Sequence, residues 1–179
     1  DTDLNQDGIL TWEEAQEARK QMQAQRNQQS ERNTSSRQQT LPPTKANVAY
    51  GDHERHVLDF WKAESDKPTP LFIWIHGGGF RGGDKRSFPA PLRDRCLEAG
   101  ISCAAIHYRL SGHAPYPAQM MDSARAVQFL RSQADQWNLD PKRFAAGGGS
   151  AGSGISQWLG YHDDLGDPHS DDPLAKQST

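Results

Sequence analysis

The segment FAAGGGSAGSG at residues 144–154 places a serine in a glycine-rich turn, between a short strand-type run and a run that favours a helix. Residues 148–152 match the pattern G-x-S-x-G, in which a serine occupies a tight strand-to-helix turn. Such a turn closes only when the neighbours of the serine are small, and here every neighbour is glycine or alanine. We therefore predict that Ser150 is a nucleophile and that the Ala151 N–H can donate to a developing oxyanion. Taken alone, the pattern also fits a structural turn or a phosphate-binding loop.

A second glycine-rich motif, HGGGF at residues 76–80, lies 74 residues before Ser150. It directly follows the apolar run Leu71–Ile75, which has the length and composition of a strand buried on both faces. The glycines allow backbone N–H groups to approach a substrate oxygen closely. A dinucleotide-phosphate loop is disfavoured, because no G-x-G-x-x-G opens a helix here and no acidic residue is suitably placed. The two motifs in this order predict a serine hydrolase.

The elements around these motifs alternate between strand and helix, which predicts an α/β fold with a doubly wound, mostly parallel sheet. The helix that ends near residue 136 has four apolar residues at helical spacing, Met121, Ala124, Val127 and Leu130. The expected strands are 56–61, 71–75, 101–106 and 144–146, and the expected helices are 90–99, 118–136 and 151–161.

Four stretches carry a family resemblance: HGGGFRGGDK at 76–85, YRLS at 108–111, NLDPKRFAAGGGSAGSG at 138–154 and HDDLGDPHSDDP at 162–173. From about residue 50 to 178 the chain resembles the α/β-hydrolase superfamily, specifically the hormone-sensitive-lipase and feruloyl-esterase-like carboxylesterases. The resemblance implies that Ser150 is the nucleophile and that Gly78, Gly79 and Ala151 supply the oxyanion-hole N–H groups. It also implies a structural role for Asp122. Gly149 stands where these esterases often have an acidic residue.

The remainder of a catalytic triad is not evident. In this fold the acid and then the histidine follow the serine in the chain, and 29 residues follow Ser150 here. His162 and His169 lie there, but we expect both to come too early to act as the base. The sequence is therefore expected to be the N-terminal part of a hydrolase, with half of the sheet and the other triad residues absent. The remaining histidines are expected at core, loop or surface positions; they are His53, His56, His76, His107 and His113.

Residues 3–14 match the twelve-residue calcium loop of an EF-hand. Gly8 would provide the sharp turn, Leu10 the apolar position and Glu14 the closing bidentate carboxylate. The predicted ligands to Ca²⁺ are Asp3, Asn5, Asp7, Ile9 through its carbonyl, Thr11 and Glu14. An acidic N-terminal turn is the alternative. Only two residues precede the loop, so the entering helix of an EF-hand is missing.

Composition indicates a folded domain joined to polar segments. Hydrophobic residues make up 34% of the chain and the mean hydropathy is −0.88, which is polar for one compact domain. We predict an EF-hand loop and exiting helix over 1–29, a disordered linker over 30–46 and the hydrolase domain over 47–179. Cys96 and Cys103 are expected to be free thiols.

The net charge of −3 predicts no attraction to nucleic acid or to an anionic membrane, and no run reaches the roughly 18 apolar residues of a membrane span. A small-molecule ester and calcium are the expected partners, in an extracytoplasmic setting. Two other functions stay open at this stage. One is a calcium-binding protein with an inactive hydrolase-like domain, and the other is an amidase or peptidase of the same fold.

Overall fold

The computed structural model describes residues 12, 16–17, 19–21 and 41–179. The chain divides into two compact units, residues 1–41 and 42–179. In the first unit the described residues up to 21 are helical, and Lys20 Nζ lies 3.7 Å from Glu17 Oε2. The six predicted calcium ligands lie outside the described residues: Asp3, Asn5, Asp7, Ile9, Thr11 and Glu14.

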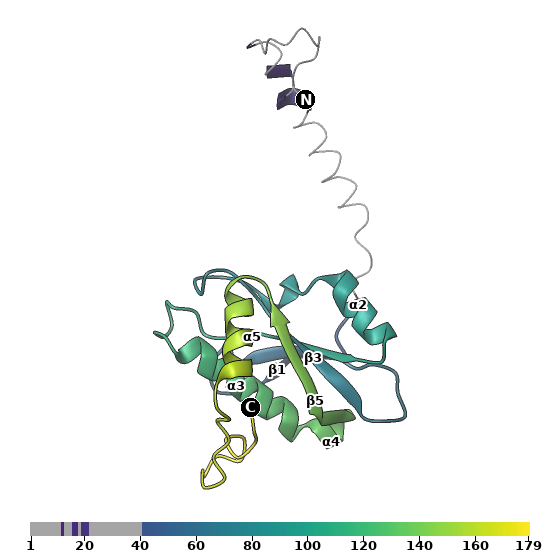
Figure 1. Ribbon diagram of the computed structural model, residues 1–179, viewed down its shortest axis with the longest axis vertical. Coiled ribbons are helices and arrows are strands. Elements are labelled where there is room, and N and C mark those ends of the chain that lie inside the picture. Colours follow the sequence, from purple (N-terminus) through teal and green to yellow (C-terminus); the bar gives the residue numbers. More distant parts are fainter. Residues whose placement is uncertain (1–11, 13–15, 18, 22–40) are drawn as a thin grey trace. The chain divides into compact units, whose positions relative to one another are not determined.

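The second unit is built on a five-stranded open sheet (Figure 1). Its strands are β1 (Lys45–Ala49), β2 (Val57–Trp61), β3 (Thr69–Ile75), β4 (Ser102–Ile106) and β5 (Leu139–Gly148), in the spatial order β1-β2-β4-β3-β5. β3 pairs in parallel with β4 and β5, whereas β2 pairs antiparallel with β1 and β4. The sheet is therefore mixed, and both glycine-rich motifs follow strands of its parallel half.

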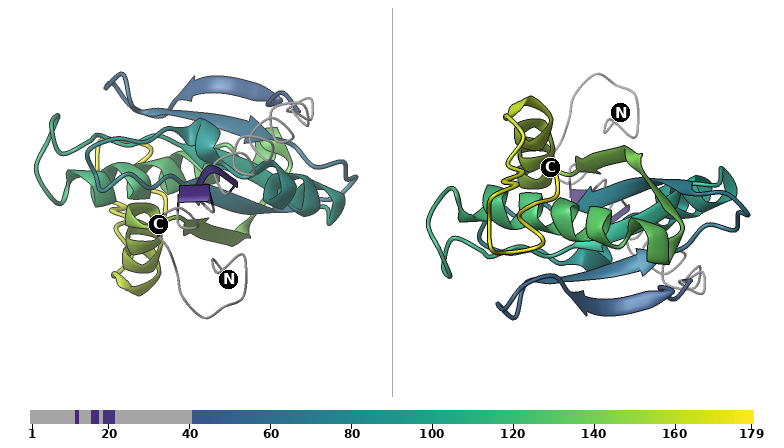
Figure 2. Two further views of the ribbon diagram at one scale, coloured as in Figure 1. Left: turned by 90° about the horizontal axis from the view of Figure 1, so that it is seen from above. Right: turned by 90° about the horizontal axis from the view of Figure 1, so that it is seen from below.

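Helices cover both faces of this sheet, as a doubly wound fold requires. They are α2 (Ala90–Glu98), α3 (Ala118–Ser132), α4 (Ala134–Trp137) and α5 (Ala151–Tyr161), with a 3₁₀ turn η1 (Lys85–Ser87). On one face Leu71, Ile73 and Ile75 of β3 share a core with residues of α3, α4 and α5. On the other face Phe72 and Trp74 pack with Phe88 and with residues of α2. Figure 2 shows α3 running along the sheet in both of its views.

The apolar face of α3 differs from the predicted one at a single position. Ala124, Val127 and Leu130 are buried as expected, but Met121 is 45% exposed and Met120 is buried in its place. Since Met120 stands four residues before Ala124, it belongs to the same helical face. The predicted helix over 118–136 also divides, because Gln133 ends α3 and precedes α4.

The cysteines, the expected linker and the possibility of a membrane span were also addressed by the sequence. Cys96 and Cys103 are free, as predicted, and burial raises the pKa of the Cys103 thiol well above its usual range. β1 begins at Lys45, within the stretch expected to be a linker. No helix in the described part of the chain is both long and apolar enough to cross a membrane.

The segment 162–179 contains no helix or strand but is held in place by polar contacts. Arg125 of α3 forms an ion pair with Asp172 at 2.5 Å. Gln128 of α3 donates to the Gln177 carbonyl, and the Thr179 N–H donates to Asp164, both at 2.9 Å. The acidic tail is thus a loop attached to α3.

Candidate active site

Ser150 occupies the turn between β5 and α5, where the sequence predicts it. Its backbone has φ +51° and ψ −114°, and the residue is exposed. Positive φ is rare for residues that carry a Cβ and often marks strain at functional sites. Ala151 is the first residue of α5, so its N–H is among those that have no carbonyl partner within the helix.

The turn can close because two of its glycines lie against the end of β3. A Cβ added to Gly148 would stand 2.2 Å from the Ile75 carbonyl oxygen, and one added to Gly152 would stand 2.0 Å from the same atom. Both distances are far below van der Waals contact. Any side chain at either position would therefore push the Ser150 turn away from β3.

The HGGG loop leaves β3 beside this turn. β3 and β5 are neighbouring parallel strands with Ile75 opposite Gly148, so both loops leave the same edge of the sheet. A Cβ added to Gly77 would lie 2.6 Å from the Gly149 carbonyl oxygen and 3.4 Å from Ser150 Cβ. The two motifs therefore meet, although 74 residues separate His76 from Ser150.

The two remaining glycines of the loop adopt backbone conformations that other residues seldom reach. Gly78 has φ +117° and Gly79 has φ +59°. The Gly78 carbonyl accepts from the backbone N–H groups of Arg81 and Gly82, which folds the loop back on itself. Gly79 has open space where a Cβ would stand. The predicted oxyanion donors thus lie on the two loops that meet at Ser150.

His76 is a structural part of the loop, in agreement with its predicted assignment there. The side chain is fully buried and stacks on Tyr108 with ring centroids 4.3 Å apart. Its Nδ1 lies 2.8 Å from the Gly77 carbonyl oxygen, and the Tyr108 hydroxyl donates to the His76 carbonyl at 2.8 Å. Burial lowers the pKa of the imidazole, which keeps the ring neutral.

Asp122 also has a structural environment. Its carboxylate accepts hydrogen bonds from the Arg109 backbone N–H at 2.8 Å, from Nε at 2.9 Å and from Nη2 at 2.6 Å. His56 Nε2 lies 3.1 Å from the same carboxylate. Burial alone would raise the pKa of Asp122, but the Arg109 hydrogen bonds outweigh it and the pKa is lowered. The residue therefore joins α3 to the loop after β4.

Two histidines follow Ser150 in the chain, His162 and His169. His162 directly follows α5, roughly 16 Å of helix away from the N-terminal end where Ser150 stands. Its ring packs on Trp158 with centroids 4.2 Å apart. His169 is exposed in the loop beyond. The position of His162 at the far end of α5 agrees with the expectation that it is not the base, and the expectation for His169 stays a prediction.

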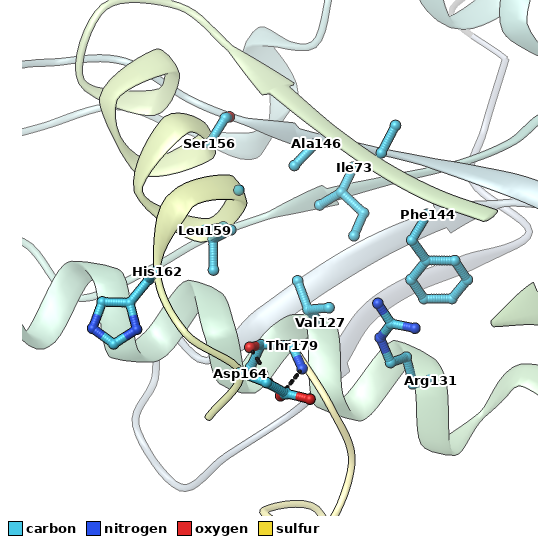
Figure 3. A pocket seen from close by; sticks show the side chains of 12 residues that line it. Ile73, Val127, Arg131, Phe144, Ala146, Ser156, Leu159, His162, Asp164 and Thr179 are labelled. Carbon is cyan, nitrogen blue, oxygen red and sulfur yellow. Dashed lines mark hydrogen bonds between the residues drawn. The ribbon is translucent and has the colours of Figure 1, made fainter. Parts of the chain in front are cut away.

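A cavity of about 600 Å³ lies between β5, α3 and the C-terminal half of α5 (Figure 3). Its apolar lining includes Ile73, Val127, Phe144 and Leu159, and Arg131 reaches its rim. The lining residues on either side of Ser150 in the sequence are Ala146 of β5 and Ser156 of α5, and none of the residues 147–155 lines the cavity. This cavity is therefore separate from the Ser150 turn.

Sequence patterns gave no indication of the role of Arg55. Its guanidinium contacts the glycine-rich loop and both residues that follow β4, His107 and Tyr108. These partners come from separate parts of the chain, and no spacing rule connects them to Arg55. The buried ion pair between Lys85 and Asp59, at 2.8 Å, was missed for the same reason.

Comparisons with known proteins show the family and the fold. The family model BD-FAE matches residues 58–176. Among curated proteins of Mycobacterium tuberculosis, esterase LipC is 29% identical over 65% of this chain and 29% of its own length. Carboxylic ester hydrolase LipN is 38% identical over 49% of this chain and 24% of its own length. The chain thus spans about a quarter of the length of these relatives.

Two solved structures share the fold. The acetyl ester-xyloside bifunctional hydrolase from Caldicellulosiruptor lactoaceticus has a TM-score of 0.68 and 26% identity, over 77% of this chain and 54% of that one. A truncated carbohydrate esterase from gut microbiota has a TM-score of 0.62 and 26% identity, over 74% of this chain and 49% of that one. The open sheet and its helices therefore correspond to part of an α/β-hydrolase.

Proposed function

The chain belongs to the BD-FAE family, and on that basis we propose that it carries the nucleophile and the oxyanion hole of a serine carboxylesterase. The observation that carries this proposal is the contact between the Ser150 turn and the HGGG loop. Ser150 lies in a strained, exposed turn, and the second glycine-rich loop approaches this turn at Gly77. The esterases among its relatives favour a carboxylic ester as the substrate.

In the proposed reaction, Ser150 Oγ attacks the ester carbonyl and transfers its proton to a general base. The oxygen of the tetrahedral intermediate becomes an anion, which Gly78, Gly79 and Ala151 stabilise through backbone N–H groups. The intermediate expels the alcohol and leaves an acyl group on Ser150, which water then hydrolyses to release the acid. We expect neither His162 nor His169 to be this base.

Esters with a small acyl group are the proposed substrates. One structural neighbour is an acetyl ester-xyloside bifunctional hydrolase and another is a carbohydrate esterase. The same machinery cleaves amides, so amide hydrolysis is the alternative within this mechanism. Hydrolysis of p-nitrophenyl acetate without measurable hydrolysis of p-nitroacetanilide would favour the ester, and Ser150-dependent hydrolysis of the anilide would favour the amide.

Labelling by a fluorophosphonate probe tests the nucleophile in the intact protein. We expect the wild-type protein to be labelled and to hydrolyse p-nitrophenyl acetate, and we expect Ser150→Ala to lose both properties, with kcat lower by at least about 10³-fold. Ser156→Ala is the matched control, because Ser156 lies on the same helix and donates to the Gly152 carbonyl. Absence of wild-type labelling would leave an inactive hydrolase-like domain as the better description.

We also propose that the N-terminal segment binds Ca²⁺ through Asp3, Asn5, Asp7, Ile9, Thr11 and Glu14. The sequence pattern alone supports this site, because these residues supply oxygen ligands at the spacing of an EF-hand loop. Calorimetric titration with CaCl₂ should detect one site, and Glu14→Gln should abolish it. A wild-type protein that binds no calcium at millimolar concentration would rule the site out.

A further inference from the structure

Arg55 connects both ends of the glycine-rich loop to the end of β4. It lies in the turn before β2 and is half-buried. Its Nε donates to the Tyr108 carbonyl at 2.8 Å, and its Nη2 donates to the Gly83 carbonyl at 3.2 Å. The same Nη2 lies 3.1 Å from His76 Nε2 and 3.1 Å from His107 Nδ1. One side chain therefore holds three separate segments together.

The chemistry of Arg55 determines which nitrogen of His76 carries the proton. A guanidinium has N–H donors and no acceptor, and it stays protonated in proteins. Because Nη2 cannot accept, its contact with His76 Nε2 is a hydrogen bond only when Nε2 carries no proton. The proton of the neutral ring is then on Nδ1, which donates to the Gly77 carbonyl at 2.8 Å.

This hydrogen bond fixes the direction of a proposed oxyanion donor. The peptide between Gly77 and Gly78 is trans, so the Gly77 carbonyl and the Gly78 N–H point in opposite directions. Holding the carbonyl on His76 therefore aims the N–H away from His76. Gly78 has no Cβ, so no side chain at this position restricts the rotation of the peptide. The orientation of the peptide therefore depends on contacts such as the hydrogen bond from His76.

We propose that Arg55 is a positioning residue for the oxyanion hole, because it holds His76 as the Nδ1–H tautomer and His76 in turn orients the Gly78 N–H. This inference rests on the proposed function, since it deepens the description of the same site. The oxyanion forms only as the ester carbonyl is attacked. A misdirected N–H should therefore lower kcat and leave KM nearly unchanged.

The kinetic test uses Arg55→Lys in the intact protein with p-nitrophenyl acetate. Lysine keeps the charge but lacks the planar fork that reaches several acceptors. We expect kcat to fall about 10- to 100-fold with KM changed by less than about threefold. Arg95→Lys, an exposed position on α2, is the matched control and should match the wild type. A rise in KM with an unchanged kcat would overturn the proposal.

A double-mutant cycle tests whether Arg55 acts through His76. In His76→Asn, the side-chain amide can donate to the Gly77 carbonyl without a choice of tautomer. We therefore expect Arg55→Lys to cost less than about threefold in kcat in the His76→Asn background. An equal loss in both backgrounds would show that Arg55 does not act through His76.

Nuclear magnetic resonance of the imidazole ¹⁵N nuclei provides a test that needs no catalysis. We expect His76 of the wild-type protein to be the Nδ1–H tautomer, and the Nε2–H form to become populated in Arg55→Lys. An Nε2–H ring in the wild type would overturn the inference even if Arg55→Lys did not fold. The result does not depend on Ser150, so it separates a failure of this inference from a failure of the proposed esterase activity.

Discussion

Arg109 donates three hydrogen bonds to the carboxylate of Asp122, from its backbone N–H, Nε and Nη2. The donor–acceptor distances are 2.8, 2.9 and 2.6 Å. The Asp122 carboxylate is buried at 2% exposure, whereas the Arg109 side chain is 31% exposed and lies at the edge of the fold. The pair fixes the loop after β4 to α3, and the same loop carries Ser111, whose N–H donates to the Phe80 carbonyl at 2.7 Å.

Asp122→Ala should destabilise the domain. The substitution leaves the Arg109 donors without their acceptor, and breaking a buried pair in this way costs about 3 kcal/mol. Urea denaturation followed by tryptophan fluorescence measures the change. Asp172→Ala is the control, since Asp172 pairs with Arg125 in a much more exposed position; a similar loss in both variants would contradict a special role for the buried pair.

Gly152→Ala should disrupt the active-site turn, because its Cβ would stand 2.0 Å from the Ile75 carbonyl oxygen. We expect a loss of stability of about 2 kcal/mol together with a loss of fluorophosphonate labelling. Gly154→Ala is the matched control on the same helix, where a Cβ meets nothing within 4 Å. Alanine there should raise stability by up to about 1 kcal/mol. Equal behaviour of the two variants would show that the close approach to β3 is unimportant.

At Ser150, in contrast to Gly154, we expect glycine to give a more stable protein than alanine. Glycine adopts φ +51° without strain, whereas alanine does not. Ser150→Gly should therefore be more stable than Ser150→Ala by about 1 kcal/mol, although both lose activity. At Ser156, inside α5, the order should reverse, because glycine is the poorer helix former. Thermal unfolding of the four variants measures both differences.

His107 should make stability decrease on mild acidification. Burial, followed by the positive charge of Arg55, lowers its pKa from 6.5 to about 4. Between these two values the unfolded chain binds a proton that the folded protein does not, so stability rises with pH across this range. The loss from about pH 6.5 to pH 4 should approach 3 kcal/mol. The lowered pKa values of His56 and His76 act in the same direction.

Urea denaturation at several pH values measures this slope. His107→Gln removes one titrating group and should make the dependence on pH shallower over the same range. An identical slope in the wild type and the variant would show that His107 does not titrate differently in the folded and unfolded states.

The sequence was most informative where structure is determined locally. The turn at Ser150 and the loop at Gly78 each require a particular short run of small residues, so both could be recognised without the structure. The helix after Ser150 was predicted with its observed ends, Ala151–Tyr161. Local spacing was less decisive at Met120 and Met121, because both fit a helical repeat and packing against the sheet decides between them.

Features that depend on distant segments could not be predicted. β1 has four exposed residues and one half-buried residue, Val48, so it lacks the apolar pattern of a buried strand. It becomes a strand by pairing with β2 at the edge of the sheet. The role of Arg55 is even harder to predict from the sequence. Its role depends on Gly83 and Tyr108, which the fold brings together and no motif connects.

The pairing of Ile75 with Gly148 has a consequence for how this domain can vary. Neighbouring strands lie about 4.8 Å apart whatever the length of chain between them. The separation of the two glycine-rich loops is therefore set by the hydrogen-bonding ladder of β3 and β5 and not by the 72 residues that lie between the two positions. Insertions in the exposed stretch 115–117 would lengthen that connection without altering the spacing of the two loops.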